Sequence, residues 1–414
     1  MGPTTTIATA QDSPTRDQKT PSHVVTGLRH PSVDALRGLV MIIMALDHTR
    51  DFFHAASMVF PPEDLSRTTT ALFLTRWVTH ICAPVFSFTA GLGAFFWMSH
   101  GRTPAQLSRF LWTRGLWLAI LDITVMRFAL TFSMTEGIVI LNVLWVLGLS
   151  MIVLALLVHI PIRLLAPMSL VVIALHDLFD PITPSRFGSF AWLWEILHQQ
   201  GLFKVGGVTA LVAYPLIPWF AVMALGFCFG KVMLRDPDVR RRTMIWMGYG
   251  MVVAFLVLRG INKYGDPEPW TTQFPHMTVL SFLRCRKYPP SLDFLLMTMG
   301  PALLILAWFE RINFSRKNPL IIFGRVPLFF FVVHFYVAHL LTFPFALVRY
   351  ERAAFLLKPL PSIGGSAELY PPNYGYSLPM TYVAWAIVVL LLYPMCLWFS
   401  RLKEHKKSWW LGYL

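Results

Sequence analysis

The sequence predicts an all-helical bundle that crosses a membrane many times, and two observations support this prediction. Hydrophobic residues make up 56% of the 414 residues and charged residues only 14%, whereas soluble globular proteins carry about 25% charged residues. The hydrophobic residues also gather in separate runs, each close to the ~20 residues that a helix needs to cross the hydrocarbon core. Together these features exclude an ordinary soluble enzyme, a disordered chain and a disulfide scaffold.

Ten of the hydrophobic runs are long enough to be spanning helices, and an eleventh span within a long connection is an alternative. The runs cover residues 35–56, 72–98, 109–131, 138–160, 163–180, 207–232, 244–261, 291–309, 319–343 and 379–400. We expect them to form one transmembrane domain over residues 31–400. Residues 1–30 are polar, rich in Pro and Thr and without an apolar segment, which predicts a disordered cytoplasmic tail and not a signal peptide. Residues 401–414 form a basic cytoplasmic tail.

The basic residues predict the orientation of these spans, because cytoplasmic loops carry an excess of Lys and Arg. With the N-terminus inside, the cytoplasmic loops hold Arg102, Arg109, Arg163, Lys231, Arg235, Arg240, Arg241, Arg242, Arg311, Arg316, Lys317, Arg401, Lys403, Lys406 and Lys407. The segment 262–290 is an exception, with Arg284, Arg286 and Lys287 on the outer side. We therefore predict a multi-pass protein of the cell (inner) membrane, surrounded by lipid, with both termini in the cytoplasm.

The same charge pattern bears on partners. The formal net charge is +14, but the positive residues cluster in short loops between apolar runs, so we do not expect nucleic-acid binding. The four cysteines lie far apart, with no CxxC pair and no histidine at metal-ligand spacing, so we expect no metal. A homodimer is left open by the sequence.

The first predicted span is unusually rich in ionisable residues, each of which costs ~2.5–3.5 kcal/mol within a bilayer and is therefore a functional candidate. These residues are Asp34, Arg37, Asp47, His48, Arg50, Asp51 and His54. At about 100° per residue, Arg37, His48 and Asp51 share one helical face, and His48 lies roughly 16 Å deeper than Arg37. Asp34 with Arg37 is equally compatible with an ion pair at a helix start. Arg50 and Asp51 are equally compatible with the outer membrane interface.

Other predicted spans add ionisable residues at membrane depth, namely Arg76 and His80 in the second, Asp122 in the third, and Arg325, His334 and His339 in the ninth. We expect Asp122 to bind a partner from another span as a structural tie. Arg325 and His339 share a helical face, whereas His334 points the opposite way and needs a separate polar neighbour. Repeated histidines, in places beside an aspartate, suit general acid–base chemistry near neutral pH.

Several segments resemble a known family. SVDALRG at 32–38, followed by an apolar stretch and ALDH at 45–48, resembles the start of the heparan-α-glucosaminide N-acetyltransferase family and its bacterial relatives. The spacing from Arg37 to His48 is similar to that of the membrane O-acetyltransferases of the acyltransferase-three family. HAAS at 54–57 resembles the part of the heparan enzyme that carries its active-site histidine, which places that role on His54. Further blocks resemble bacterial members, at residues 83–91, 287–301 and 324–341.

The resemblance implies an integral membrane acyltransferase that takes an acyl group, most simply acetyl, from cytoplasmic acyl-CoA to a sugar or envelope glycan. Arg37, Arg325 and Asp34 are then the candidates for binding CoA. His48 is the first candidate for the base, with Asp47 or Asp51 as its partner, and His54 is the second. The further buried polar candidates are His80, Arg76, Asp122, His334 and His339. DHTRD at 47–51 departs from the heparan enzyme, so the acceptor need not be an amino sugar.

We expect the first, second, third and ninth spans to surround a polar chamber that opens to the cytoplasmic face. The alternative function is a proton-coupled transporter or a transporter of lipid-linked sugars, because buried His and Asp residues also serve proton relays. Transporters tend to contain internal repeats with broken helices in matching positions. The first span has no comparably charged counterpart in the second half of the sequence, which favours an enzyme.

Overall fold

A computed structural model of the chain describes residues 1–2, 30–134, 138–273, 275–361 and 365–406. Most of the predicted N-terminal tail and the end of the C-terminal tail lie outside the described residues. The described part is mostly helical, as predicted, with one small sheet that the sequence analysis missed. The helices are α1 (Pro31–Phe53), α2 (Thr70–Thr79), α3 (Cys82–Ser99), α4 (Pro104–Leu121), α5 (Arg127–Thr131), α6 (Val143–Leu157), α7 (Ile162–Leu175), α8 (Ala191–Leu197), α9 (Trp219–Met233), α10 (Pro237–Ile261), α11 (Thr278–Leu283), α12 (Leu292–Phe309), α13 (Pro319–Arg325), α14 (Pro327–Tyr350) and α15 (Leu378–His405). The strands are β1 (Val139–Leu141), β2 (Gly201–Val205) and β3 (Val208–Val212).

Six helical segments of the described chain are long and apolar enough to cross a membrane. They are Thr70–Ser99, Ile162–Phe179, Pro237–Ile261, Leu292–Phe309, Pro327–Tyr350 and Leu378–His405. Val143–Leu157 and Trp219–Met233 are apolar but shorter. Large apolar side chains are exposed on the outer helices, for example Trp246 and Val253 on α10 and Leu390 and Trp398 on α15. Extended apolar surfaces of this kind mark contact with a membrane.

Some predicted spans are interrupted at residues with a local physical reason. The ninth is divided between α13 and α14, because Pro327 disfavours a helical conformation at Val326. The third continues from α4 into α5 through a π-helical turn at Asp122–Met126. The predicted runs 138–160 and 207–232 begin with β1 and β3, and their helical parts are correspondingly short.

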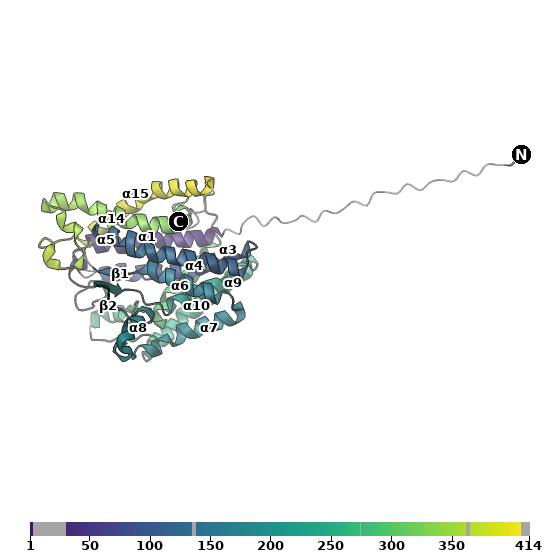
Figure 1. Cartoon of the computed structure of the whole chain (residues 1–414), viewed down its shortest axis with the longest axis horizontal. Helices are drawn as coiled ribbons and strands as arrows, with labels where there is room; N and C mark the ends of the chain where they lie inside the picture. Colours follow the sequence, from purple (N-terminus) through teal and green to yellow (C-terminus); the bar gives the residue numbers. More distant parts are fainter. Residues whose placement is uncertain (3–29, 135–137, 274, 362–364, 407–414) are drawn as a thin grey trace.

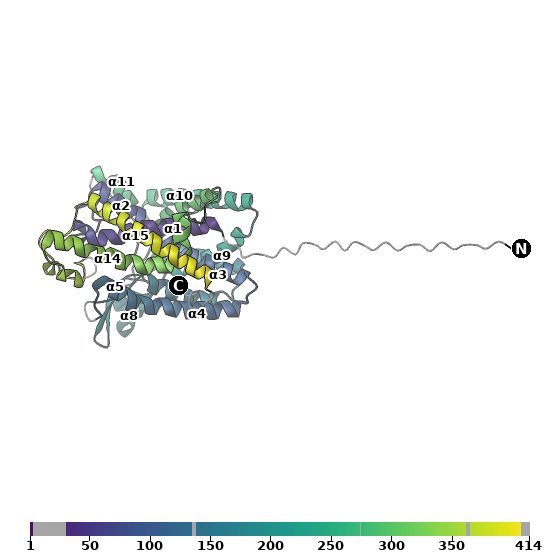
Figure 2. The ribbon, with the colours of Figure 1, turned by 90° about the horizontal axis from the view of Figure 1, so that it is seen from above.

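The helix α1 lies inside the bundle, where it packs against α2, α3, α12, α13, α14 and α15. Figure 1 shows α1 running along the length of the molecule, and Figure 2 shows α15 crossing over α1 and α14. The contact with α13 is close, because a Cβ atom at Gly38 would lie 1.9 Å from the carbonyl oxygen of Leu320 and one at Gly324 would lie 1.8 Å from that of Asp34. Only glycine fits at these two positions.

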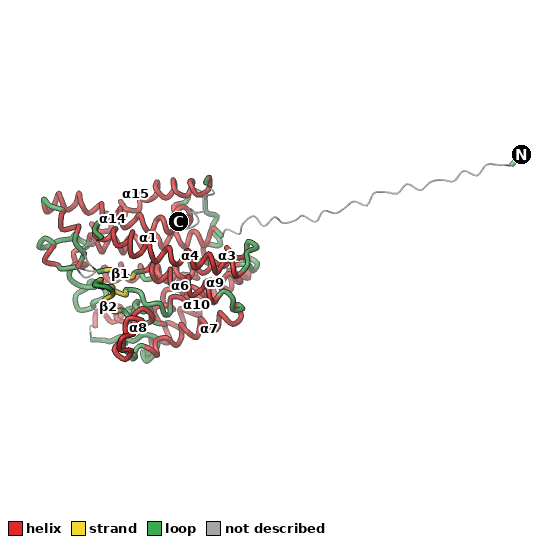
Figure 3. The backbone as a smooth tube through the Cα atoms, in the orientation of Figure 1, coloured by secondary structure: helices red, strands yellow, loops and turns green. Residues whose placement is uncertain are grey.

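The small sheet lies at the end of the bundle where α1 ends, in strand order β1–β3–β2 (Figure 3). The strand β1 pairs in parallel with β3, with Val139 opposite Ala210, and β2 pairs antiparallel with β3, with Gly201 opposite Val212. Gly206 and Gly207, both with positive φ, make the tight turn between β2 and β3. The sheet supplies one wall of the cavity described below.

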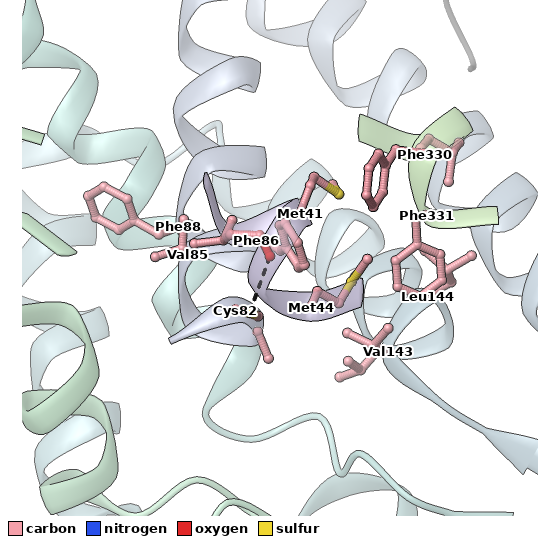
Figure 4. Packing of buried hydrophobic residues seen from close by; sticks show 14 of the residues in the cluster. Met41, Met44, Cys82, Val85, Phe86, Phe88, Val143, Leu144, Phe330 and Phe331 are labelled. Atoms are coloured by element: carbon pink, nitrogen blue, oxygen red, sulfur yellow. Dashed lines mark hydrogen bonds between the residues drawn. The ribbon is translucent and has the colours of Figure 1, made fainter. Parts of the chain in front are cut away.

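A layer of buried apolar side chains surrounds the middle of α1 (Figure 4). This apolar layer consists of Met41, Met44, Val85, Phe86, Phe88, Val143, Leu144, Phe330 and Phe331, contributed by α1, α3, α6 and α14. Cys82 lies beside it, and its thiol donates to the carbonyl oxygen of Val40 at 3.3 Å. The layer lies along the middle of α1, between the charged residues at its two ends.

Candidate functional site

A cavity of about 540 Å³ lies at the end of the bundle where α1 ends. Its floor belongs to the apolar layer, through Met44, Phe86, Val143 and Phe331. Its walls include residues 57–63 after α1, Ile140 and Leu211 of the sheet, and Leu360. Cavities of ~300–1,000 Å³ are typical of small-molecule sites, so this one is large enough to be a binding site.

The last turns of α1 provide the polar wall of the cavity. Asp47, His48, Arg50 and Asp51 all line it. Residues three and four apart lie on the same face of a helix, so the spacing 47–50–51 and 48–51 lets these side chains interact with one another. Local sequence alone therefore brings most of the site together.

The charged side chains form a connected network. Asp47 contacts Arg50 at 2.8 Å and accepts a hydrogen bond from Arg76 at 2.5 Å. Arg50 also donates to Asp51 at 2.7 Å. We call Asp47, Arg50, Asp51, Arg76 and Glu63 the ion-pair network.

Glu63 completes this network from the loop between α1 and α2. Arg76 donates from Nε to Glu63 at 2.7 Å, and Nε2 of His80 lies 3.5 Å from the same carboxylate. Burial raises the pKa of Glu63, but the Arg76 guanidinium and the His80 ring outweigh burial and hold the pKa well below its usual range. Glu63 therefore remains a carboxylate that fixes Arg76 against Asp47.

His48 is the histidine that lines the cavity. Its side chain is 22% exposed, and Nδ1 lies 3.7 Å from a carboxylate oxygen of Asp51. Its ring lies 4.2 Å from the ring of Phe335 and 5.2 Å from that of His334. A histidine beside a carboxylate in a cavity can act as a general base.

The structure distinguishes the two predicted partners of His48. Both oxygens of Asp47 face guanidinium groups, those of Arg50 and Arg76, whereas Asp51 faces both Arg50 and His48. Asp51 is therefore the carboxylate beside the His48 ring. Asp47 holds the two arginines in place.

His54 lies just beyond the end of α1 and does not line the cavity. Its Nδ1 accepts a hydrogen bond from the backbone N–H of Ala56 at 3.1 Å, which begins a short 3₁₀ turn. Its backbone forms a bridge with Tyr376. The backbone therefore occupies Nδ1 of His54, whereas Nδ1 of His48 faces the Asp51 carboxylate.

Arg37, Asp34 and Arg325 lie at the opposite end of α1. Arg37 donates to the carbonyl oxygen of Thr89 at 2.6 Å and lies 3.7 Å from Asp34, while Arg325 donates to Glu404 at 2.9 Å. None of the three predicted CoA-binding residues lines the cavity. Residues of the first, second, third and ninth predicted spans do line the cavity, among them His48, Arg76, Leu130 and Phe335, but its lining does not extend to the end of α1 that holds Arg37.

The other buried candidates have mixed roles. Asp122 accepts a hydrogen bond from the backbone N–H of Asn142 at 2.7 Å and so ties the π-helical turn to the start of α6. Both ring nitrogens of His339 face backbone carbonyl oxygens, of Ala129 and Leu356, at 2.8 and 2.9 Å. These two residues make structural ties. The sequence analysis placed Arg325 on the same helix as His339, which is wrong because the helix breaks at Val326.

His334 is fully buried, and its Nδ1 lies 3.2 Å from the carbonyl oxygen of Phe330. Its Nε2 has no hydrogen-bond partner among the described residues. The sequence predicted that His334 needs a separate polar neighbour, and this neighbour is His48. The two histidines come together because α14 packs against α1.

Several polar residues of the cavity were not among the predicted site residues, including Glu63, Lys287 and Tyr288. Glu63 carries no motif, since it lies in a loop. Two signals pointed to Lys287 and Tyr288: the basic residues of 262–290 oppose the orientation rule, and residues 287–301 resemble a block of the family. Within the described ranges, no three His, Cys, Asp or Glu residues are grouped so as to hold a metal ion.

The comparison with protein families now adds an independent observation. The family model for heparan-alpha-glucosaminide N-acetyltransferase, catalytic, matches residues 29–263, more than half of the chain. The chain belongs to this family. Membership makes it an acetyltransferase-type enzyme of the membrane. The matched region contains α1, the ion-pair network and both candidate catalytic histidines, whereas Lys287 and α14 lie beyond it. A comparison with curated proteins gives no match.

Proposed function

We propose that this family member transfers an acetyl group from acetyl-CoA to a hydroxyl or amine of a sugar or envelope glycan, with His48 as the base. The observation that carries the proposal is the His48–Asp51 pair in a cavity of suitable size, within the region that matches the family. The acceptor would enter from the end of the bundle where the cavity-lining loops lie.

The chemistry requires one proton to move. His48 takes the proton of the acceptor as its oxygen or nitrogen attacks the thioester carbonyl, and Asp51 stabilises the resulting imidazolium. The C–S bond then breaks, and His48 returns the proton to the CoA sulfur. The products are the acetylated acceptor and free CoA. A variant of this route has a histidine carry the acetyl group itself before transfer.

The donor would bind with its phosphates at the Arg37 end, on the predicted cytoplasmic side. Arginine suits phosphate through its planar fork, and Arg37, Arg325 and Asp34 lie together there. Their present partners include Thr89 and Glu404, so CoA would have to replace some of these contacts. The acyl arm would then cross the apolar layer, over the roughly 16 Å of helix rise between Arg37 and His48.

The proposed topology has ten spans in the inner membrane with both termini cytoplasmic. The six long apolar segments and the two shorter apolar helices account for eight of them. The charged helix α1 and the helix that runs from α4 through α5 would supply the other two. The surroundings of α1 support this assignment, because Asp47 and Arg50 are buried and six other helices pack against α1.

Purified protein in detergent tests the proposal by two measurements. We expect acetyl-CoA to raise the melting temperature, and we expect a panel of amino sugars and glycans to release free CoA in the presence of acetyl-CoA. Deletion cells compared with wild-type cells by glycan and lipid profiling would identify the natural acceptor. Absence of acetyl-CoA binding together with proton-coupled solute uptake in vesicles would replace the enzyme with the transporter.

A further inference from the structure

The segment 262–290 carries three basic residues near its end, and two of them have carboxylate partners. Arg284 lies 2.9 Å from Glu268, and Arg286 lies 2.5 Å from Asp180. Lys287 differs from both, because it is only 8% exposed and lines the cavity. Of the three charges that oppose the orientation rule, those of Arg284 and Arg286 are therefore paired with carboxylates, and that of Lys287 is buried in the cavity wall.

Lys287 is also different from the other cations of the cavity. Arg50 and Arg76 are each held by two carboxylates of the ion-pair network. In the described part of the chain, no carboxylate lies within 4 Å of the Lys287 ammonium group, whose recorded neighbours are the rings of Tyr288 at 5.2 Å and Tyr214 at 6.0 Å. A buried charge without a paired anion is costly, so the arrangement suits an anion that arrives with a ligand.

The backbone around Lys287 is firmly held. The Arg259 side chain is buried and donates to the carbonyl oxygens of Phe282 and Glu268 at 3.0 and 2.9 Å. Asp266 accepts from the backbone N–H of Arg286 at 2.8 Å and from the hydroxyl of Ser291 at 2.5 Å. These contacts fix the backbone on either side of Lys287, so that only its side chain has to be ordered when a ligand binds.

We propose that Lys287 binds an anionic group of the acceptor, a carboxylate or a phosphate on the sugar, and so selects acidic acceptors and positions them for attack. This inference rests on the proposed function. Arg50 and Arg76 each contact two carboxylates of the cavity wall, whereas Lys287 makes no ion pair within 4 Å among the described residues, which makes it the cation most accessible to a ligand. Lys287 is then a binding residue that sets specificity, separate from the base.

Kinetics with three probes test the proposal: glucosamine, glucosamine 6-phosphate and glucuronic acid, each with acetyl-CoA. We expect the wild-type protein to prefer one or both charged sugars. Lys287→Met should reduce that preference about 10- to 100-fold through the KM of the acceptor, because hydrogen bonds to charged groups are worth about that factor. We expect kcat and the KM for acetyl-CoA to change little, and Lys287→Arg to retain most of the preference.

Arg284→Met is the matched control, since it removes a basic residue of the same segment outside the cavity, and it should leave the preference unchanged. A preference that survives Lys287→Met would overturn the proposal. A raised KM for acetyl-CoA would overturn it as well, by assigning Lys287 to the donor. Thermal shift with glucosamine 6-phosphate and glucuronic acid tests binding without turnover. If the wild-type protein lacks transferase activity but either probe raises its melting temperature and not that of Lys287→Met, the proposed function fails and the anion site stands. If the probes raise the melting temperatures of both proteins equally, the anion site is overturned.

Discussion

At the scale of single residues, the site depends on which carboxylate reaches which cation. Asp47 and Asp51 are four residues apart on α1, and both were candidates for the partner of His48. Arg76, from α2, forms an ion pair with one oxygen of Asp47, whereas Asp51 lies beside His48. A contact from another helix thus separates two residues that look alike in the sequence.

We predict that His48→Ala lowers turnover at least 100-fold, because a general base contributes about 10²–10⁴-fold. Acetyl-CoA affinity, measured by thermal shift, should remain nearly unchanged. His54→Ala is the comparison, because its Nδ1 is held by Ala56 and it does not line the cavity. If His54→Ala abolishes turnover and His48→Ala does not, the catalytic role belongs to His54.

Asp47→Asn and Asp51→Asn should have different effects. Loss of the Asp47 charge leaves the buried Arg50 and Arg76 without a shared partner, and breaking a buried pair costs about 3–5 kcal/mol, so we expect a clear fall in melting temperature. Asp51→Asn should mainly lower turnover. Asp238→Asn is the control, since Asp238 pairs with Arg241 at the exposed surface and such pairs contribute little. Equal melting temperatures for all three variants would show that Asp47 has no structural role.

At the scale of elements, the close packing of α1 on α13 positions the Arg37 end of the molecule. The contact has no space for a side chain at Gly38, where a Cβ atom would meet the Leu320 backbone. Backbone atoms cannot move aside as the end of a flexible side chain can. The position of α13, and with it that of Arg325, therefore depends on this glycine.

Gly38→Ala should separate α13 from α1 and lower the melting temperature, with a cost of at least the 1–3 kcal/mol typical of overpacking. Gly250→Ala on α10 is a matched helical control, because a Cβ atom there would meet nothing within 4 Å. We expect this control to be neutral or slightly stabilising, as alanine favours helices over glycine. A Gly38→Ala protein as stable as the control would contradict the packing argument.

At the scale of the whole molecule, the two ends of α1 carry different chemistry on opposite sides of the apolar layer. The Arg37 end holds the residues proposed to bind the CoA phosphates, and the His48 end has the cavity and the loops that enclose it. The proposed transfer from a donor on one side to an acceptor on the other depends on this arrangement. Its orientation in the membrane is accordingly a central prediction.

Labelling of single introduced cysteines tests that orientation, since all four native cysteines are buried. Asp238→Cys at the start of α10 and Ser189→Cys before α8 place exposed thiols at the predicted cytoplasmic and outer sides. A membrane-impermeant maleimide added to intact spheroplasts should label position 189 alone, and lysis should expose position 238. Labelling of both positions in intact spheroplasts would contradict the topology.

The sequence by itself determined the helical membrane class, the family resemblance and the charged face of α1, because composition, helical spacing and short motifs are local properties. His48 and Asp51 could be grouped in advance for that reason. Only the tertiary structure decided that Asp47 binds Arg76, that His334 meets His48, and that Lys287 enters the cavity. These contacts join segments far apart in the chain, and hydrophobic periodicity does not encode which face of one helix meets which face of another.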